Sequence, residues 1–342
     1  MLNKYDGAER NGRFFVKIRA AALPRGELYV NDIKMTEADG LYTAEAPLDG
    51  YHNTLTLYDA QTRESKKIIV FWLKNSTGHY RLSLDDNIWC LRDAAKYASE
   101  YKSIFDNPYF AIYKKVHDLY DTKVQMNIYY QCEGFDLSMM PDKYKSEFKE
   151  NADWFRFSFH ARQNDPDKPY LNTTYEALLS DYDKVVAEIR RFAGQEIQPV
   201  TTLHWGESTR EGVRALRARG IRCLFGFVGT PGDVGCAYYL DKGLSDHIYG
   251  RDFWYDAEED MIFATINIFI NNVELKDIVP YLDVERQNPH RSGNMELLIH
   301  EQYFYPHYVA YRPDYAERVL ASVKWAADNG YTPAWVEDHL FE

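Results

Sequence analysis

From Tyr80 onward, short apolar runs alternate with longer amphipathic runs, and this alternation constrains the fold more than any other feature of the chain. The runs 124–130, 154–160 and 221–227 are short, apolar and rich in aromatic or β-branched residues, as strands are. The run 175–194 instead repeats its apolar residues every three or four positions, as a helix does. A strand–helix order that recurs along the chain predicts an α/β fold, in which parallel strands form a (β/α) barrel.

The first part of the chain has a different pattern. Between residues 12 and 72, short alternating runs such as 13–20, 40–48 and 66–73 are separated by turn residues at roughly ten-residue spacing. This spacing predicts a small β-sandwich of immunoglobulin-like type. We therefore expect an accessory domain over residues 1–75, which packs against or orients substrate, and a barrel domain over residues 76–342.

Composition excludes several classes of partner. The chain has 342 residues and a formal net charge of −12, which argues against a general nucleic-acid or anionic-membrane binder. No apolar run is long enough to span a membrane. Aromatic residues make up 15% of the chain, which suits surfaces that stack against sugars. The polar start of the chain does not resemble a signal peptide, which predicts a cytoplasmic protein, or an exported one whose leader was removed.

Titratable residues of the metal-binding types end several of the expected strands. In a (β/α) barrel the active site forms at the carboxyl ends of the strands. The residues found there are Asp85-Asp86, His160, His204 and His300-Glu301. Carboxylate and imidazole together suit a divalent cation, zinc first, with cobalt, nickel or iron as alternatives. The pattern therefore predicts one metal ion at the barrel mouth.

The stretch "RLSLDDNIWC" (81–90) places two aspartates side by side after an apolar run. A cation can hold one aspartate as a ligand, and its charge lowers the cost of keeping the neighbour ionised. That neighbour can then act as a base toward metal-bound water. Adjacent side chains of a strand point to opposite faces, so both can face the mouth only if the strand ends there. Asn87 suits such a turn.

These residues resemble the motifs of the polysaccharide deacetylases, metal-dependent carbohydrate esterases on a distorted (β/α)7 barrel. "SLDDN" (83–87) is similar to the family motif T-F-D-D-G, and "LLIH" (297–300) to its late L-x-x-H motif. Trp205-Gly206 stands where the family has an aromatic residue followed by glycine. The resemblance covers about residues 80–340. It implies that Asp85 is the catalytic base, Asp86 a metal ligand and His300 the general acid.

The chain departs from the family pattern at two points. The family usually has a second histidine four residues after the first, but here Asn164 follows His160 at that spacing. The family's arginine before the aromatic residue is also missing, and His204 precedes Trp205 instead. We therefore expect His204 to supply the third ligand, so that the metal ligands are Asp86, His160 and His204.

The implied activity is metal-assisted hydrolysis of an N-acetyl or O-acetyl group on a carbohydrate. Asp85 would take a proton from the attacking water, and His300 would give one to the leaving amine or alcohol. Further residues near the strand ends are expected to contact substrate: Trp205, Glu301, Tyr303 and Tyr305.

Two alternatives stay open. A glycoside hydrolase would need a pair of carboxylates across a cleft, for which Asp85, Glu207, Glu301 and Glu337 are candidates, but it leaves the three histidines unexplained. The barrel could also belong to a carbohydrate-binding relative without catalysis, because the usual histidine pair is broken. Metal content and turnover distinguish these alternatives from a deacetylase.

Overall fold

The strand and helix runs after residue 77 form a mixed α/β structure around parallel sheets in the computed structural model, which describes residues 1–21, 26–227, 229–230, 233–235 and 238–341. Distances between Cα atoms divide the chain into a first unit, Met1–Thr77 with the last residues from Asp338, and a second unit, Gly78–Glu337. The two domains expected from the sequence, 1–75 and 76–342, stay a prediction.

The first unit contains two antiparallel sheets, with strand orders β1-β2-β6-β5 and β4-β3-β7-β8. Its strands are β1 (Gly7–Arg10), β2 (Arg13–Ala21), β3 (Leu28–Val30), β4 (Ile33–Lys34), β5 (Thr36–Ala38), β6 (Leu41–Leu48), β7 (His52–Asp59) and β8 (Ser65–Phe71). Alternate residues of β2 are buried, and Phe14 and Val16 share one apolar cluster with Val30 and Leu55 of the other sheet. One core therefore serves both sheets.

The second unit contains two larger sheets, with strand orders β13-β10-β9-β21-β20 and β14-β15-β19-β18, while β22 pairs with β9 outside the first order. Its strands are β9 (His79–Asn87), β10 (Val124–Tyr129), β11 (Gln131–Cys132), β12 (Phe135–Asp136), β13 (Phe155–Ala161), β14 (Val200–Thr201), β15 (Cys223–Gly226), β16 (Gly229–Thr230), β17 (Asp233–Val234), β18 (Phe253–Asp256), β19 (Met261–Thr265), β20 (Ile268–Phe269), β21 (Asn294–His300) and β22 (Thr332–Pro333).

Strands β9, β10 and β13 of one sheet, and β14, β15 and β19 of the other, are parallel and lie in chain order. On the other side of β9, β21 pairs with it in parallel, while β18 pairs with β19 antiparallel. The hydroxyl of Thr201 on β14 donates a hydrogen bond to the carbonyl of Phe159 on β13, so the two sheets meet at these strands. Every residue of β10 and β19 is buried, as expected for parallel strands covered on both faces. This arrangement brings the carboxyl ends of several strands to one edge.

Helices follow the strands as the sequence indicates. They are α1 (Trp89–Lys96), α2 (Pro108–Tyr120), α3 (Lys145–Glu150), α4 (Tyr175–Phe192), α5 (Arg210–Ala218), α6 (Lys242–Tyr249), α7 (Ile278–Glu285), α8 (Tyr315–Asp328) and α9 (Glu337–Leu340). Thr174 caps α4 and Thr209 caps α5 through their side chains. Gly220, with φ of +91°, follows the end of α5.

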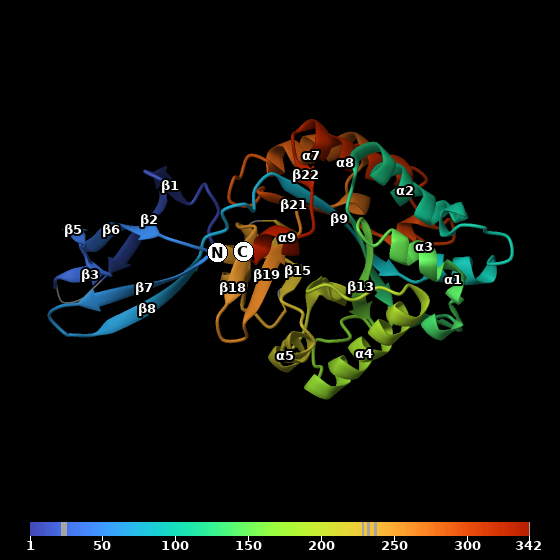
Figure 1. Ribbon diagram of the computed structural model, residues 1–342, viewed down its shortest axis with the longest axis horizontal. Helices are drawn as coiled ribbons and strands as arrows, with labels where there is room; N and C mark the ends of the chain where they lie inside the picture. The colour runs from blue at the N-terminus through green and yellow to red at the C-terminus, as the bar shows by residue number, and fades with distance from the viewer. Residues whose placement is uncertain (22–25, 228, 231–232, 236–237, 342) are drawn as a thin grey trace. The chain divides into compact units, whose positions relative to one another are not determined.

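The helices of the second unit lie outside its strands, with α2, α7 and α8 on one side and α4 and α5 on another (Figure 1). Their apolar faces pack on the outer faces of the strands, for example Leu178 and Val185 of α4 with Phe157 of β13 in one core. None of the helices that the structure describes has both the length and the apolar character needed to cross a membrane. The inner faces of the strands are left for the polar residues described next.

Candidate metal centre

The end of β9 presents both aspartates to one cavity because the strand carries an extra residue there. Leu84 pairs with Met126 of β10, but the next pair joins Asn87 to Ile128, so β9 uses one residue more than its partner. Asp86 has a φ of +65°, in the left-handed region, where the chain departs from regular strand geometry. The strict alternation of strand side chains is thereby broken. Asp85 and Asp86 both line a cavity of about 320 Å³.

Two histidines from neighbouring strand ends meet the Asp86 carboxylate. The Nε2 atom of His160, near the end of β13, lies 2.9 Å from Asp86 Oδ1. The Nδ1 atom of His204, in a short 3₁₀ helix (His204–Gly206) after β14, lies 3.0 Å from the same oxygen. One ligand atom from each of the three residues lies within 4.8 Å of those from the other two, and all three residues are buried. The structure thus brings the three expected metal ligands together.

The outer nitrogen of each histidine is held by a backbone carbonyl. Nδ1 of His160 lies 2.6 Å from the carbonyl oxygen of Thr202, and Nε2 of His204 lies 3.2 Å from that of Asn164. A carbonyl can only accept, so each outer nitrogen carries a hydrogen. Each inner nitrogen faces Asp86, where it can donate when the ring is protonated and can bind a cation when the ring is neutral. Histidines that bind metals are oriented in this way by their outer nitrogen. The donor set and its orientation fit a divalent cation.

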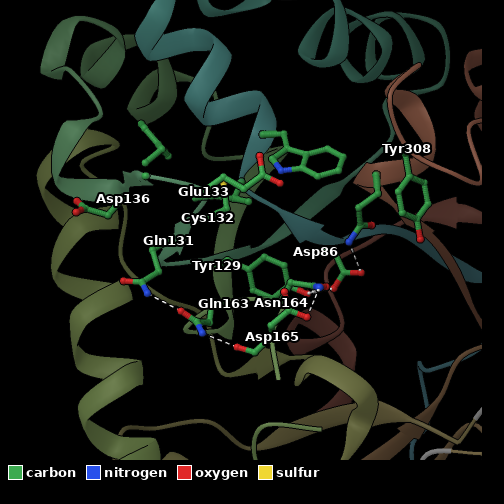
Figure 2. A pocket seen from close by; sticks show the side chains of 15 residues that line it. Asp86, Tyr129, Gln131, Cys132, Glu133, Asp136, Gln163, Asn164, Asp165 and Tyr308 are labelled. Atoms are coloured by element: carbon green, nitrogen blue, oxygen red, sulfur yellow. Dashed lines mark hydrogen bonds between the residues drawn. The ribbon is translucent and has the colours of Figure 1, made fainter. Parts of the chain in front are cut away.

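Two neutral side chains hold the Asp86 carboxylate from either side. The Tyr129 hydroxyl, at the end of β10, donates a hydrogen bond to Oδ1 and lies 2.9 Å from His204 Nδ1, and Gln302 Nε2 donates to Oδ2 over 2.8 Å. Figure 2 shows Tyr129 and Asn164 beside Asp86. The strand-end pattern of titratable residues does not indicate Tyr129 or Gln302, although Tyr129 is the last residue of the buried strand β10.

The site favours positive charge at its centre. Burial by itself raises the pKa of the Asp86 carboxyl, but hydrogen bonds from His160 and His204 outweigh it, and the pKa lies well below its ordinary value. Burial lowers the pKa of His160, yet the charge of Asp85 and the contact with Asp86 leave that pKa raised overall. A cation bound between these ligands would supply the positive charge in place of a proton.

Asp85 and His300 face each other across neighbouring strands. They are paired in the parallel register of β9 and β21, and both line the cavity that Asp86 lines. Asp85 Oδ1 accepts a hydrogen bond of 2.6 Å from Asn127 Nδ2. The Oδ1 atom of Asn271 accepts from the backbone N–H of His300 and lies 3.0 Å from its Nδ1, so Nδ1 carries a hydrogen. Nε2 is therefore the His300 nitrogen left to exchange a proton with a ligand.

The cavity has an aromatic wall, and a second cavity of about 640 Å³ adjoins it. Trp205, which is 43% exposed, and Tyr303 line the first cavity, and their expected role as substrate contacts stays a prediction. Asp86, Gln302 and Tyr308 line both cavities. The second cavity extends over the loops after β10 and β13 (Figure 2). Together they could accommodate a ligand larger than one small molecule.

Glu301 and Tyr305, which we expected to contact substrate, line neither of these two cavities. Glu301 is fully buried, and its carboxylate accepts hydrogen bonds from the backbone N–H groups of Ile88, Trp89 and Cys90 at the start of α1. Tyr305 is 7% exposed and packs edge-on against Trp89. The chain turns into a 3₁₀ helix (Glu301–Phe304) directly after β21, which directs Glu301 inward.

The carboxylates of the glycoside-hydrolase alternative do not gather around the cavity. Of that group, Asp85 is in the cavity lining. Glu207 forms an ion pair with Lys168, Glu337 forms one with Arg156, and Glu301 caps α1. These partners account for the three glutamates, and the described residues thus offer little support for paired carboxylates across a cleft.

Comparisons with known proteins give distant structural similarity. No protein-family model and no curated protein matches the sequence. A CE4-family pseudoenzyme from Bacillus anthracis is similar at 9% identity and a TM-score of 0.40, over 78% of this chain and 66% of that one. A mutant of that pseudoenzyme, described as having restored enzymatic activity, gives 8% identity and 0.40 over 84% and 86%. A 4-alpha-glucanotransferase from Thermococcus litoralis gives 11% and 0.48 over 77% and 39%.

Proposed function

We propose that this protein is a metal-dependent hydrolase that removes acetyl groups from a carbohydrate, and that it is a divergent relative of the polysaccharide deacetylases. One observation carries the proposal: His160 and His204 each give their outer nitrogen to a backbone carbonyl and turn their inner nitrogen toward Asp86 Oδ1. Histidines that bind metals are oriented in this way, which favours a metal centre over a chance cluster of polar groups. Zinc is the cation we expect, with cobalt, nickel or iron as alternatives.

The proposal includes the finer fold assignment. We propose that the parallel strands from β9 to β21 form the distorted (β/α)7 barrel of such enzymes, and that the sheets of the first unit form an immunoglobulin-like sandwich. The parallel pairing of most long strands in the second unit supports the first assignment, and the shared apolar core of the two antiparallel sheets supports the second.

The residues around the centre have distinct tasks in the proposed reaction. A bound cation would lower the pKa of a water molecule and polarise the acetyl carbonyl. Asp85, fixed by Asn127 through Oδ1, would take the proton of the attacking water. His300, with Nδ1–H held by Asn271, would deliver a proton from Nε2 to the leaving amine or alcohol. Trp205 and Tyr303 would hold the sugar on the cavity wall.

A carbohydrate-binding protein without catalysis is the second candidate. It is favoured by Asn164, which replaces the usual second histidine and contributes its backbone carbonyl to His204. Such a protein would bind glycans in the same two cavities without turnover.

The experiment is acetate release from a panel of N- and O-acetylated glycans by the protein loaded with zinc or cobalt. Metal content is measured in parallel by mass spectrometry. Acetate release that is abolished by a chelator supports the deacetylase. Glycan binding without acetate release supports the carbohydrate-binding protein. If the protein retains no divalent metal after loading, the proposed metal centre is contradicted.

A further inference from the structure

A buried ion pair lies on the inner face of the second unit, away from the ligand residues. Arg81 of β9 and Glu296 of β21 are paired in the strand register, and neither side chain is exposed. Two hydrogen bonds of 3.0 and 2.7 Å join the guanidinium to the carboxylate. Such pairs contribute little net stability, because desolvating both charges offsets their attraction. Its position suggests a different task, since Arg81 and Asp85 lie on the same side of β9.

Arg81 fixes the orientation of the Gln125 amide on the neighbouring strand. Its Nη1 atom lies 2.7 Å from Gln125 Oε1, and a guanidinium can only donate, so the oxygen of the amide must face it. The Nε2 end of Gln125 is directed away, where it donates to the carbonyl of Val200 over 3.1 Å. Because that carbonyl can only accept, both ends of Gln125 are determined by partners that cannot reverse their roles.

Gln125 in turn fixes the Asn127 amide. Gln125 Nε2 donates its second hydrogen to Asn127 Oδ1 over 2.8 Å, which leaves Asn127 Nδ2 to donate to Asp85 Oδ1 over 2.6 Å. Both amide residues are buried, at 2% and 0% exposure. Because Arg81 can only donate, it fixes the orientation of both amides, and Asn127 must therefore donate to one oxygen of Asp85. Turning either amide around would bring two donors or two acceptors face to face.

We propose that Gln125 and Asn127 are positioning residues, which carry the fixed hydrogen-bond polarity of the Arg81–Glu296 pair to Asp85 and hold its Oδ1 as an acceptor. The proposal deepens the function proposed above and depends on Asp85 being the base. A proton on Oδ1 would face the Nδ2–H of Asn127, so the proton taken from water goes to Oδ2. The two amides therefore determine that Oδ2 is the Asp85 oxygen that takes the proton, and they fix the orientation of the carboxylate.

The first test does not depend on activity. Protein labelled with ¹⁵N-asparagine is followed by NMR, and hydrogen exchange of the Asn127 side-chain amide is compared with that of the exposed Asn11. The chain of hydrogen bonds from Arg81 through Gln125 and Asn127 to Asp85, here called the amide relay, predicts slow hydrogen exchange of the Asn127 side-chain amide. It also predicts that the resonance of this amide shifts in both Asp85→Ala and Gln125→Met. Exchange as fast as that of Asn11, or a resonance that ignores both substitutions, would overturn the relay.

The second test is kinetic and uses Asn127→Leu, which keeps a similar shape but removes the donor. The relay predicts a kcat lowered on the order of a hundredfold, as for a displaced catalytic group, with KM and metal affinity unchanged. Gln125→Met, which leaves the Asn127 donor in place, should lower kcat less. Ser322→Ala is the matched control, because it removes one buried hydrogen bond, to the carbonyl of Arg318 on α8, and shares no partner with Gln125, Asn127 or Asp85.

The outcomes separate this inference from the proposed function. Equal effects of Asn127→Leu and Ser322→Ala on kcat would show that Asn127 acts only through packing, and would overturn the proposal. If the wild-type protein releases no acetate but its Asn127 amide is protected from exchange, the proposed hydrolase function is contradicted. The amide relay would then still hold as the arrangement that orients Asp85.

Discussion

The Nε2 atom of His160 lies 2.9 Å from Oδ1 of Asp86, so the ends of β13 and β9 meet at one pair of ligand atoms. The Nδ1 atom of His204 reaches the same oxygen from a third segment. Three segments far apart in the chain therefore converge on a single carboxylate. A cation placed among them would replace contacts that now join a carboxylate to imidazole nitrogens, which explains why so many polar groups share one small buried volume.

The first prediction concerns His204. His204→Ala should weaken divalent-metal binding by more than the roughly 10- to 100-fold that is usual when only an outer partner of a ligand is lost. The measurement is competition with a chelator for zinc and cobalt. His52→Ala, an exposed histidine of the first unit, is the control and should leave the affinity unchanged. Equal affinity in the two variants would exclude His204 from the centre.

The second prediction separates the two aspartates. Asp85→Asn should retain the metal and lose hydrolysis by about a hundred- to ten-thousand-fold, because an amide can accept a hydrogen bond but cannot take the proton. Acetate release and metal occupancy are measured on the same sample. Loss of the metal instead would show that Asp85 is a ligand, and the roles of Asp85 and Asp86 would be reversed.

The third prediction concerns the proposed acid. His300→Ala should also retain the metal, because the His300 ring is hydrogen-bonded to Asn271 and not to the carboxylate oxygens of Asp86. Its pH–rate profile should retain the limb on the acid side and change the limb on the basic side, since the proton donor is what disappears. An unchanged basic limb would assign that limb to another group.

Much of the fold could be predicted because periodicity is local. The strand at 124–130 and the helix at 175–194 correspond to β10 and α4 within a few residues. The short strands β1, β4 and β5 were missed, since two to four exposed residues carry no periodic signal.

Site residues could be predicted where the residue type itself indicates metal binding, and could not be predicted where their role depends on the three-dimensional arrangement. Aspartate and histidine at strand ends indicated the ligands, and the structure brings them together. The neutral partners were missed, although Gln125, Asn127 and Tyr129 alternate with apolar residues along β10 in a buried strand. That alternation marked a polar inner face. The role of Glu301 depends on a 3₁₀ turn and on a helix far away in the sequence, so strand-end reasoning misplaced it.

The fourth prediction uses the buried carboxyl of Glu301. Burial raises its pKa to about 7, although backbone hydrogen bonds from α1 act in the opposite direction. The folded state therefore holds this proton more tightly than the unfolded state, so the contribution to stability is full below about pH 4.5 and is lost as the pH rises through about 7. Glu301→Gln removes this titration. The stability of the wild type relative to the variant should fall by up to about 3 kcal/mol from pH 4.5 to pH 8.

Denaturant unfolding of the metal-free proteins, measured at several pH values in the presence of a chelator, checks this difference. The chelator excludes a contribution from metal binding, which also varies with pH. Stability curves of the wild type and of Glu301→Gln that stay parallel across the range would show that Glu301 does not change its proton affinity on folding.

The last prediction concerns the origin of the amide relay. Arg81→Met leaves the Glu296 carboxylate buried without its guanidinium and Gln125 without its donor, which should cost about 3–5 kcal/mol of the free energy of unfolding. The double variant Arg81→Met/Glu296→Met removes both charges and should be more stable than Arg81→Met alone. Burial of the second methionine side chain, at position 296, contributes in the same direction.

Lys324→Ala is the control, because the ion pair of Lys324 with Asp328 on α8 has side chains that are 56% and 58% exposed, and its loss should matter far less. Chemical denaturation of all four proteins gives the comparison. If Arg81→Met unfolds no more easily than Lys324→Ala, the buried pair is not formed. If the double variant is also several kcal/mol less stable than the wild type, the charges stabilise the fold directly. A double variant about as stable as the wild type leaves orientation of Gln125, and through it of Asp85, as the reason for burying them.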